Sequence, residues 1–311
     1  MVSRKQQVLT LRNAFWIAAL AVTGALPQQG NAEGHGRKFY ADDPLRREPA
    51  PRPVNGVVVR QVDHIYDFLD SSLVTPGREG KVAKHARQPA FDVNTLGEVP
   101  DSSWYTNRHA FHRMSIADLQ RGPGNSTPPD PNHAWRITSA KSDGITSGFV
   151  IEDGRKNRYL LKFDPPLYPE LCSGPEVIGS KMFYALGYST PENYIVHLRR
   201  EQLQITDGVM YRHPSGKKVP LTEHMVDELL QAQPKLADGT YRALASLWLN
   251  GKVVGPFDYR ETRSDDPNDT IPHQNRRVLR GLAVFAAWVN HHDTSQINTC
   301  LLYTSPSPRD S

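Results

Sequence analysis

Three apolar runs between Trp135 and Asp164 constrain the fold of this chain more than any other part of it. The runs read WRITSAK, SGFVIED and RYLLKFD, and the turn DGRKN joins the second run to the third. Apolar and polar residues alternate along the runs, as they do in a strand with one buried face. An Asp-Gly pair in the turn between two such runs is a strong hairpin signal. The sequence therefore predicts an antiparallel sheet that begins at Trp135.

Helices and further strands are predicted after this hairpin, which indicates an α+β fold. The helices are expected at Glu176–Leu186, where Gly187 ends the helix, at 221–235, and at 274–289, where the residues are apolar enough for a buried helix. The strands are expected in NYIVHLRR at 193–200 and in YRALASLWLNG at 241–251.

The N-terminus has the outline of a signal peptide. Arg4, Lys5 and Arg12 accompany the apolar stretch Ala14–Leu26, and small residues follow at 30–32. The apolar stretch of about 13 residues is shorter than the roughly 20 residues that span a bilayer. We therefore expect export to the periplasm or beyond, without a permanent membrane anchor. A buried N-terminal helix is the alternative interpretation.

The two segments after the signal peptide differ in character. Residues 33–60 are polar and rich in proline, which is typical of a linker. Residues 61–134 form an N-terminal extension, in which Val62–Leu73 has the apolar spacing of an amphipathic helix. Trp104, Tyr105 and His109 in this extension would serve either as a recognition surface or, more usually for such aromatics, as packing residues.

The tail at 300–311 does not look native. Cys300 to Asp310 reads CLLYTSPSPRD, which resembles the translation of one reading frame of a common sequencing adapter. We expect the native chain to continue past Thr299 with other residues. Cys172 is then the one genuine cysteine, and it has no internal disulfide partner.

The net charge of +4 comes from arginines scattered along the chain, and no basic and aromatic pattern of a nucleic-acid reader is present. We therefore expect no nucleic-acid partner. A nucleophile elbow of the form G-x-S-x-G is also absent, which excludes the usual serine hydrolases.

The order of elements resembles the protein-kinase-like fold. In kinases a lysine on the third strand holds the nucleotide phosphates and is positioned by a glutamate on the following helix. Lys162 in YLLKFD and Glu176 in GPEVIGSK occupy these places. The resemblance implies an N-terminal lobe at 135–260, made of an antiparallel sheet plus one helix. A helical C-terminal lobe would start at 261–299 and be cut short.

The same resemblance implies a catalytic loop in HHDTSQIN. Asp293 would accept the proton of the substrate hydroxyl, and Asn298, five residues later, would hold a magnesium ion. The loop is similar to those of the HipA-type and CotH-like kinases rather than to the His-Arg-Asp form. The second metal-binding aspartate of kinases would follow Thr299. The plain alternative is that Asp293 caps a turn and Asn298 starts a strand.

A phosphate-covering loop is expected between the first two strands. The segment SAKSDGITSG resembles the loops of HipA-type and phosphoinositide kinases, and its Ser142 and Gly144 would contact ATP. A glycine hairpin that binds no ligand is an equally common reading. A rival site is a metal-hydrolase cluster that begins with His291, His292 and Asp293, with His273 nearby in sequence, although its histidines lack the usual ligand spacing.

Longer segments resemble a group of exported bacterial proteins, which supports export and a kinase-like architecture. They read FYADDPL, NTLGEVPDSSWYTNR, LKFDPP, ALGYSTPENYIV and DDPNDTIPH. The function we predict is ATP- and magnesium-dependent phosphoryl transfer to a hydroxyl of a protein or small-molecule acceptor, with the chain as written inactive. The alternative is a non-catalytic exported binding protein on the same scaffold, which the scarcity of ATP outside the cytoplasm favours.

Overall fold

A computed structural model describes residues 20–23, 88–124, 128–141, 147–212, 217–249, 251–255, 258–291, 294 and 298–303. The predicted linker 33–60 and the predicted helix Val62–Leu73 lie outside these residues. Within them the fold is α+β, with one six-stranded sheet, two smaller sheets and four α-helices. None of the helices in the described ranges is long and apolar enough to cross a membrane.

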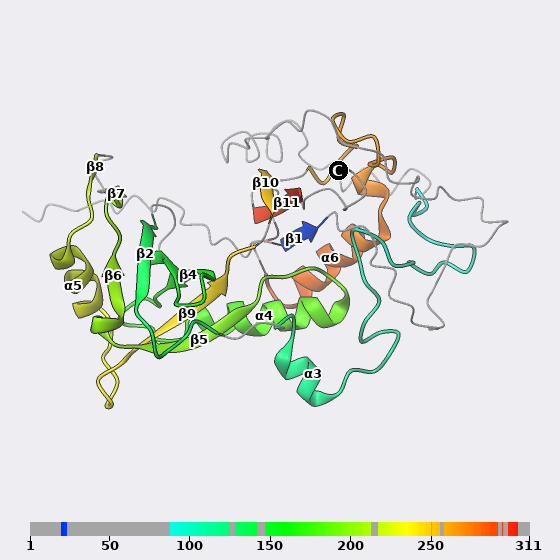
Figure 1. The fold of residues 1–311 in the computed structure, drawn as a ribbon. Coiled ribbons are helices and arrows are strands. Elements are labelled where there is room, and N and C mark those ends of the chain that lie inside the picture. The colour runs from blue at the N-terminus through cyan, green and yellow to red at the C-terminus, as the bar shows by residue number, and fades with distance from the viewer. Residues whose placement is uncertain are drawn as a thin grey trace, which may run out of the picture.

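The six-stranded sheet has the order β5-β9-β4-β3-β2-β6 (Figure 1). Its strands pair antiparallel, except that β2 and β6 run parallel. The predicted hairpin is confirmed. The strand bounds are β2 Trp135–Ala140, β3 Gly148–Glu152, β4 Arg158–Lys162, β5 Asn193–Leu198, β6 Leu203–Ile205 and β9 Tyr241–Leu247.

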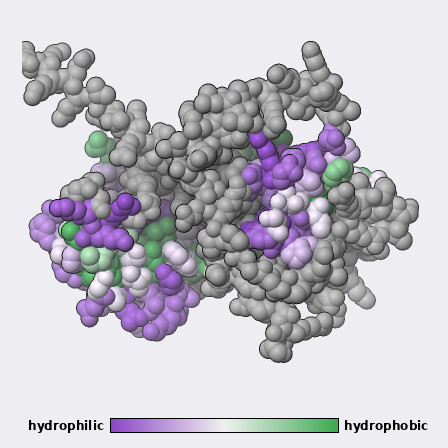
Figure 2. Space-filling view, turned by 90° about the horizontal axis from the view of Figure 1, so that it is seen from above, coloured by the Kyte–Doolittle hydropathy of each residue, from purple (hydrophilic) through white to green (hydrophobic). Residues whose placement is uncertain are grey.

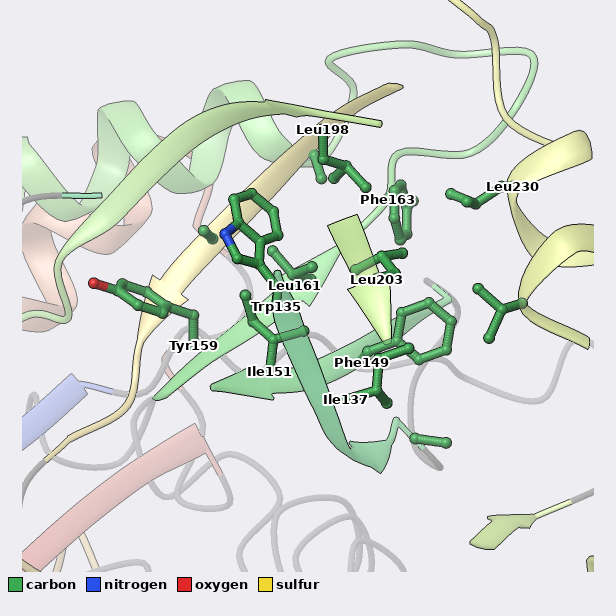
Figure 3. Close-up of a cluster of buried hydrophobic side chains, with 14 of the residues drawn as sticks. Trp135, Ile137, Phe149, Ile151, Tyr159, Leu161, Phe163, Leu198, Leu203 and Leu230 are labelled. Carbon is green, nitrogen blue, oxygen red and sulfur yellow. The ribbon is translucent and has the colours of Figure 1, made fainter. Parts of the chain in front are cut away.

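One face of this sheet forms the main hydrophobic core (Figure 3). Tyr159, Leu161 and Phe163 project to this face from β4 and the residue after it, and all three are buried. Helix α5 (Glu223–Gln231) adds Leu230 to the core. Because side chains alternate along a strand, Lys162 projects to the opposite face.

Helix α4 (Ser173–Leu186) joins the sheet to the other half of the described structure (Figure 1). Its C-terminal half packs against α6 (Arg277–Trp288) through Phe183, and Gly187 ends the helix with a φ of 113°. A Cβ at Gly187 would lie 2.2 Å from the ring of Tyr105, so glycine is needed there for space as well as for conformation.

The aromatic residues of the N-terminal extension pack against these helices. Tyr105 meets Tyr188 edge to face at 5.8 Å between ring centroids, and Trp104 belongs to the same hydrophobic cluster. Packing is therefore confirmed as the fate of both residues. The extension also contains helix α3 (Ile116–Arg121), where the sequence analysis predicts no helix.

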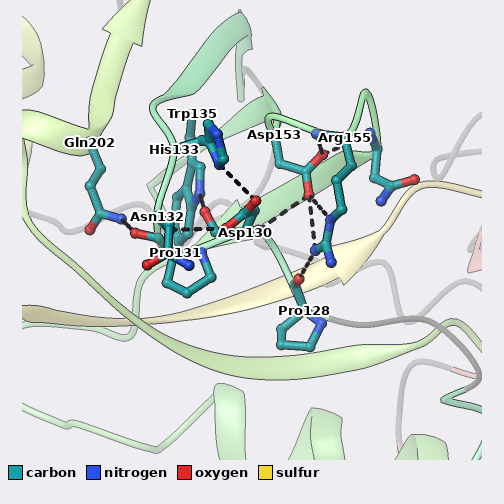
Figure 4. A network of polar contacts seen from close by, with 10 residues as sticks. Pro128, Asp130, Pro131, Asn132, His133, Trp135, Asp153, Arg155 and Gln202 are labelled. Atoms are coloured by element: carbon teal, nitrogen blue, oxygen red, sulfur yellow. Dashed lines mark hydrogen bonds and ion pairs between the residues drawn. The ribbon is translucent and has the colours of Figure 1, made fainter.

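A polar network fixes the turn between β3 and β4 (Figure 4). The Asp153 carboxylate accepts hydrogen bonds from the backbone amides of Arg155 and Asn157, and from that of Asp130 in the preceding loop. The carbonyl of Asp130 in turn accepts the indole N–H of Trp135 at 2.6 Å. The turn and the start of the sheet are thus held by one set of contacts.

The two smaller sheets are separate from the six-stranded sheet. Strands β7 (Met210–Arg212) and β8 (Lys218–Pro220) form a hairpin, and Tyr211 of β7 packs against the main core. Strand β11 (Thr299–Tyr303) pairs with β1 (Leu20–Thr23) and β10 (Lys252–Gly255). Strand β1 lies within the predicted signal peptide, and most of β11 lies within the predicted foreign tail.

Candidate functional site

Figure 2 shows the described surface from above, where hydrophilic residues predominate and hydrophobic residues form smaller areas at the sheet end. The hydropathy of this view does not mark a binding site. The buried charges of the sheet face that carries Lys162 are more informative, because charged side chains are rarely buried unless they are paired.

Lys162 and Glu176 form a buried ion pair. The Nζ atom of Lys162 lies 2.5 Å from Oε1 of Glu176, and their side chains are only 5% and 9% exposed. Lys162 ends β4, and Glu176 lies in the first turn of α4. The structure thus brings together the two residues that the sequence pattern selected, 14 positions apart.

The predicted phosphate-covering loop ends beside Lys162, and its start pairs with its end. Gly148, where the chain re-enters the sheet after the loop, is the register partner of Lys162. The amide of Lys141 donates to the carbonyl of Gly148 at 3.0 Å, and the amide of Phe163 donates to the carbonyl of Ser147 at 3.1 Å. Ser142 and Gly144 themselves lie outside the described residues.

A second set of polar contacts surrounds the start of α4. Oδ1 of Asp164 accepts the backbone amides of Cys172 and Ser173, at 2.9 and 2.8 Å. Its Oδ2 accepts the Ser173 hydroxyl at 2.6 Å and Nη1 of Arg242 at 2.8 Å. Asp164 therefore caps the helix from outside, where amide groups have no partner within the helix.

This network explains why α4 begins at Ser173 rather than at the predicted Glu176. Sequence reasoning named none of Asp164, Ser173 and Arg242. The one local signal was the carboxylate of Asp164 two residues after Lys162. Arg242 lies on β9, and its role depends on β9 being the neighbour of β4 in the sheet.

The electrostatics of the site follow from these contacts. Burial alone would raise the pKa of Asp164, but the hydrogen bonds from Ser173 and from the amide of Cys172 outweigh it and hold the pKa below its ordinary value. The Cys172 thiol shows the opposite effect. Burial, together with the negative charges of Asp164 and Glu176, raises its pKa to about 11.

A small hollow opens between β4 and the start of α4. It is lined by Lys162, Phe163, Asp164, Cys172, Ser173, Glu176 and Leu244. Cys172 is a free thiol, as the sequence predicts. The hollow thus places an amine, two carboxylates and a thiol around one space.

The C-terminal site residues are described only in part. Asp293 and His292 lie outside the described residues. Asn298 is buried directly before β11, and it is not among the residues that line the hollow at Lys162. The structure therefore leaves the predicted roles of Asp293 and Asn298 as predictions.

The rival metal site was expected to use His273 and His291. His273 is buried, with Nε2 at 2.6 Å from Asp269, and His291 packs edge to face on the ring of Phe183. Within the described ranges, no group of three His, Cys, Asp or Glu side chains is placed to hold a metal ion.

His273 instead belongs to a buried polar cluster formed by residues that precede α6 in the chain. Asp269 accepts hydrogen bonds from Nε2 of His273 and from Arg276, the latter at 3.2 Å. Nδ1 of His273 bonds to the carbonyl of Asp258, and the guanidinium of Arg276 stacks over Trp104 at 4.3 Å.

Comparison with protein-family models, with curated proteins and with solved structures gave no match.

Proposed function

We propose that this chain is built on a kinase-like scaffold for phosphoryl transfer from Mg-ATP to a hydroxyl group. The observation that carries the proposal is the buried Lys162–Glu176 pair, at 2.5 Å. Lys162 lies on the third strand counted from Trp135, and Glu176 lies on the helix that follows. A kinase requires this arrangement, because the lysine that meets the phosphates has to be held by a carboxylate.

The side chains beside Lys162 on its face of the sheet are apolar. Its register partner Gly148 has no side chain, so nothing projects from β3 directly beside the amine. Val150 and Leu160, the pair that follows on the same face, are apolar, as is Leu244 on β9. An apolar wall with one fixed cation is the usual composition of a small-molecule site.

Each residue has a proposed role. Lys162 would contact the phosphates, and Glu176 would hold Lys162 in place. The loop with Ser142 and Gly144 would supply backbone N–H groups to the phosphates. Asp293 would accept the proton of the acceptor hydroxyl, and Asn298 would bind magnesium. The metal would supply charge neutralisation of the phosphates.

Nucleotide-dependent thermal stabilisation tests the proposal. The source DNA is first sequenced past the codon for Thr299, and the protein is then produced with the continuation that this DNA encodes. Saturating Mg-ATP should then raise the melting temperature, since a ligand at about 100 times its Kd stabilises the folded state by about 2.7 kcal/mol. Lys162→Ala should abolish this response.

Lys156→Ala is a matched control, because Lys156 pairs with Glu152 at 3.7 Å on the exposed surface. It should leave the response intact. Stabilisation without phosphoryl transfer to any acceptor would assign the scaffold to a non-catalytic binding protein. An absence of any response in the parent chain would overturn nucleotide binding altogether.

A further inference from the structure

The start of α4 is held by contacts that come from two strands. Asp164 leaves β4 two residues after Lys162, and Arg242 lies on β9 two residues before Leu244, the register partner of Lys162. Both meet Ser173, the first residue of α4. Nη1 of Arg242 lies 2.6 Å from the Ser173 hydroxyl, and Asp164 accepts both the hydroxyl and the amide of Ser173.

Two other polar contacts hold this end of the helix: the Lys162–Glu176 pair, and the side-chain amide of Asn193 on β5, which donates to the carbonyl of Glu176 at 3.4 Å. The connection from Asp164 to Ser173 exposes large apolar side chains, with Leu167 at 83% and Leu171 at 57%. The apolar packing of α4 against α6 lies near its other end, at Phe183. The four hydrogen bonds that Asp164 accepts are therefore the largest set of polar contacts at the first turn of α4.

Glu176 belongs to that first turn, three residues after Ser173, and its amide bonds to the carbonyl of Cys172 at 3.2 Å. Any shift of Ser173 relative to β4 therefore moves Glu176 relative to Lys162. We infer that Asp164, with Arg242 and Ser173, is a positioning group that keeps Glu176 on Lys162 and so keeps the lysine ready for the phosphates. This inference rests on the proposed function.

The charge of the network agrees with this role. The carboxylate of Asp164 lies where helix N–H groups point and 2.8 Å from the cationic side chain of Arg242. Asp164→Asn keeps the size of the side chain and one oxygen acceptor but removes the charge. The asparagine side chain cannot accept all the hydrogen bonds from the amides, the hydroxyl and the guanidinium, because an NH₂ donor replaces one carboxylate oxygen.

The test compares Asp164→Asn with Glu170→Gln. Glu170 also approaches Arg242, with Nη2 at 3.7 Å, but its side chain is 70% exposed. Two quantities are measured on the chain with its native continuation. One is the apparent Kd for Mg-ATP from the concentration dependence of the melting temperature. The other is the hydrogen exchange of the α4 backbone amides.

For Asp164→Asn we expect at least a tenfold weaker apparent Kd and faster exchange in the first turn of α4, with exchange near Phe183 unchanged. Glu170→Gln should alter neither quantity. In a Glu176→Gln background, Asp164→Asn should add little to the loss of affinity, because it acts through Glu176. A merely structural role would lower the melting temperature with the Kd unchanged, and that result overturns the inference.

The two proposals fail in different ways. If the parent chain gives no response to Mg-ATP, nucleotide binding is overturned, and with it the link from Asp164 to phosphate contact. The hydrogen exchange of the α4 amides still tests whether Asp164 positions the first turn of α4. Unchanged exchange at residues 173–177 in Asp164→Asn would overturn that positioning, whatever the nucleotide result.

Discussion

Gly148 and Lys162 are register partners across β3 and β4, and the backbones approach so closely there that a Cβ on Gly148 would lie 2.0 Å from the carbonyl oxygen of Leu161. The strand that enters the sheet after the predicted phosphate loop therefore has to begin with glycine. Gly148, which lies opposite the candidate Lys162, is thus a position where a larger side chain does not fit.

Gly148→Ala should lower the free energy of unfolding by about 1–3 kcal/mol, since the backbone must move to admit the methyl group. Gly179 in α4 provides a matched control, because no atom lies within 4 Å of a Cβ built there. Gly179→Ala should stabilise the protein by about 0.5–1 kcal/mol through helix propensity. Urea unfolding measures both changes. Equal effects of the two substitutions would contradict the close approach at Gly148.

Breaking the Lys162–Glu176 pair from one side should be costly. Glu176→Ala leaves a buried ammonium group without its carboxylate and should destabilise the fold by about 3–5 kcal/mol. The double variant Lys162→Met with Glu176→Leu replaces the pair by apolar side chains and should recover most of that loss. Chemical denaturation of Lys162→Met, Glu176→Leu and the double variant gives the coupling energy. Additive losses would show that the two side chains do not depend on each other.

Acid should weaken the buried polar cluster that precedes α6 in the chain. Burial would raise the pKa of Asp269, but the hydrogen bond and charge of His273 outweigh it and hold the pKa below the ordinary value of 3.8. A carboxylate with a lowered pKa contributes stability above its ordinary pKa, and this contribution is lost as the pH falls toward the folded-state value. The free energy of unfolding is therefore expected to fall on acidification.

Asp269→Asn should consequently be less stable than the parent chain near neutral pH, and the difference should shrink as the pH falls below about 4. Thermal melts between about pH 2 and pH 7 follow this difference. A stability difference between the two proteins that stays constant over this pH range would mean that Asp269 does not contribute through its charge.

The thiol of Cys172 should react slowly in the folded protein. Burial and the charges of Asp164 and Glu176 raise its pKa from 9.0 to about 11, so the reactive thiolate is rare near pH 8. In a chain with Cys300→Ser, alkylation should be roughly a hundred times slower than in the same chain unfolded in urea. Asp164→Asn removes one of the negative charges and should speed the reaction. Folded and unfolded chains that react alike would contradict the raised pKa.

The longer strands and helices from Trp135 onward could be predicted because they depend on local patterns, whereas the short strands β6, β7, β8 and β10 were not predicted. Alternation of apolar residues selected β2, β3 and β4, and the glycine after Leu186 selected the end of α4. The starts of α4 and α6 differ from the prediction because a carboxylate from another part of the chain accepts backbone amides there. Helix α6 begins at Arg277 rather than Gln274, because Asp92 accepts the amides of Arg277 and Val278.

The candidate pair of Lys162 and Glu176 was also accessible to sequence reasoning, since a strand followed by a helix places both residues within a short stretch. The groups that hold this pair were not. Arg242 reaches Asp164 from 78 residues away, and Trp104 stacks on Arg276 from a separate part of the chain.

The sequence by itself thus indicated the longer strands and helices and their apolar faces, and the resemblance to kinases singled out Lys162 and Glu176. The tertiary structure alone decided that β9 lies next to β4 and that Asp164 caps α4. The reason is physical. Periodicity records whether a side chain is buried, whereas the partner of a buried charge depends on strand order, which is set by hydrogen bonds between residues far apart in the chain.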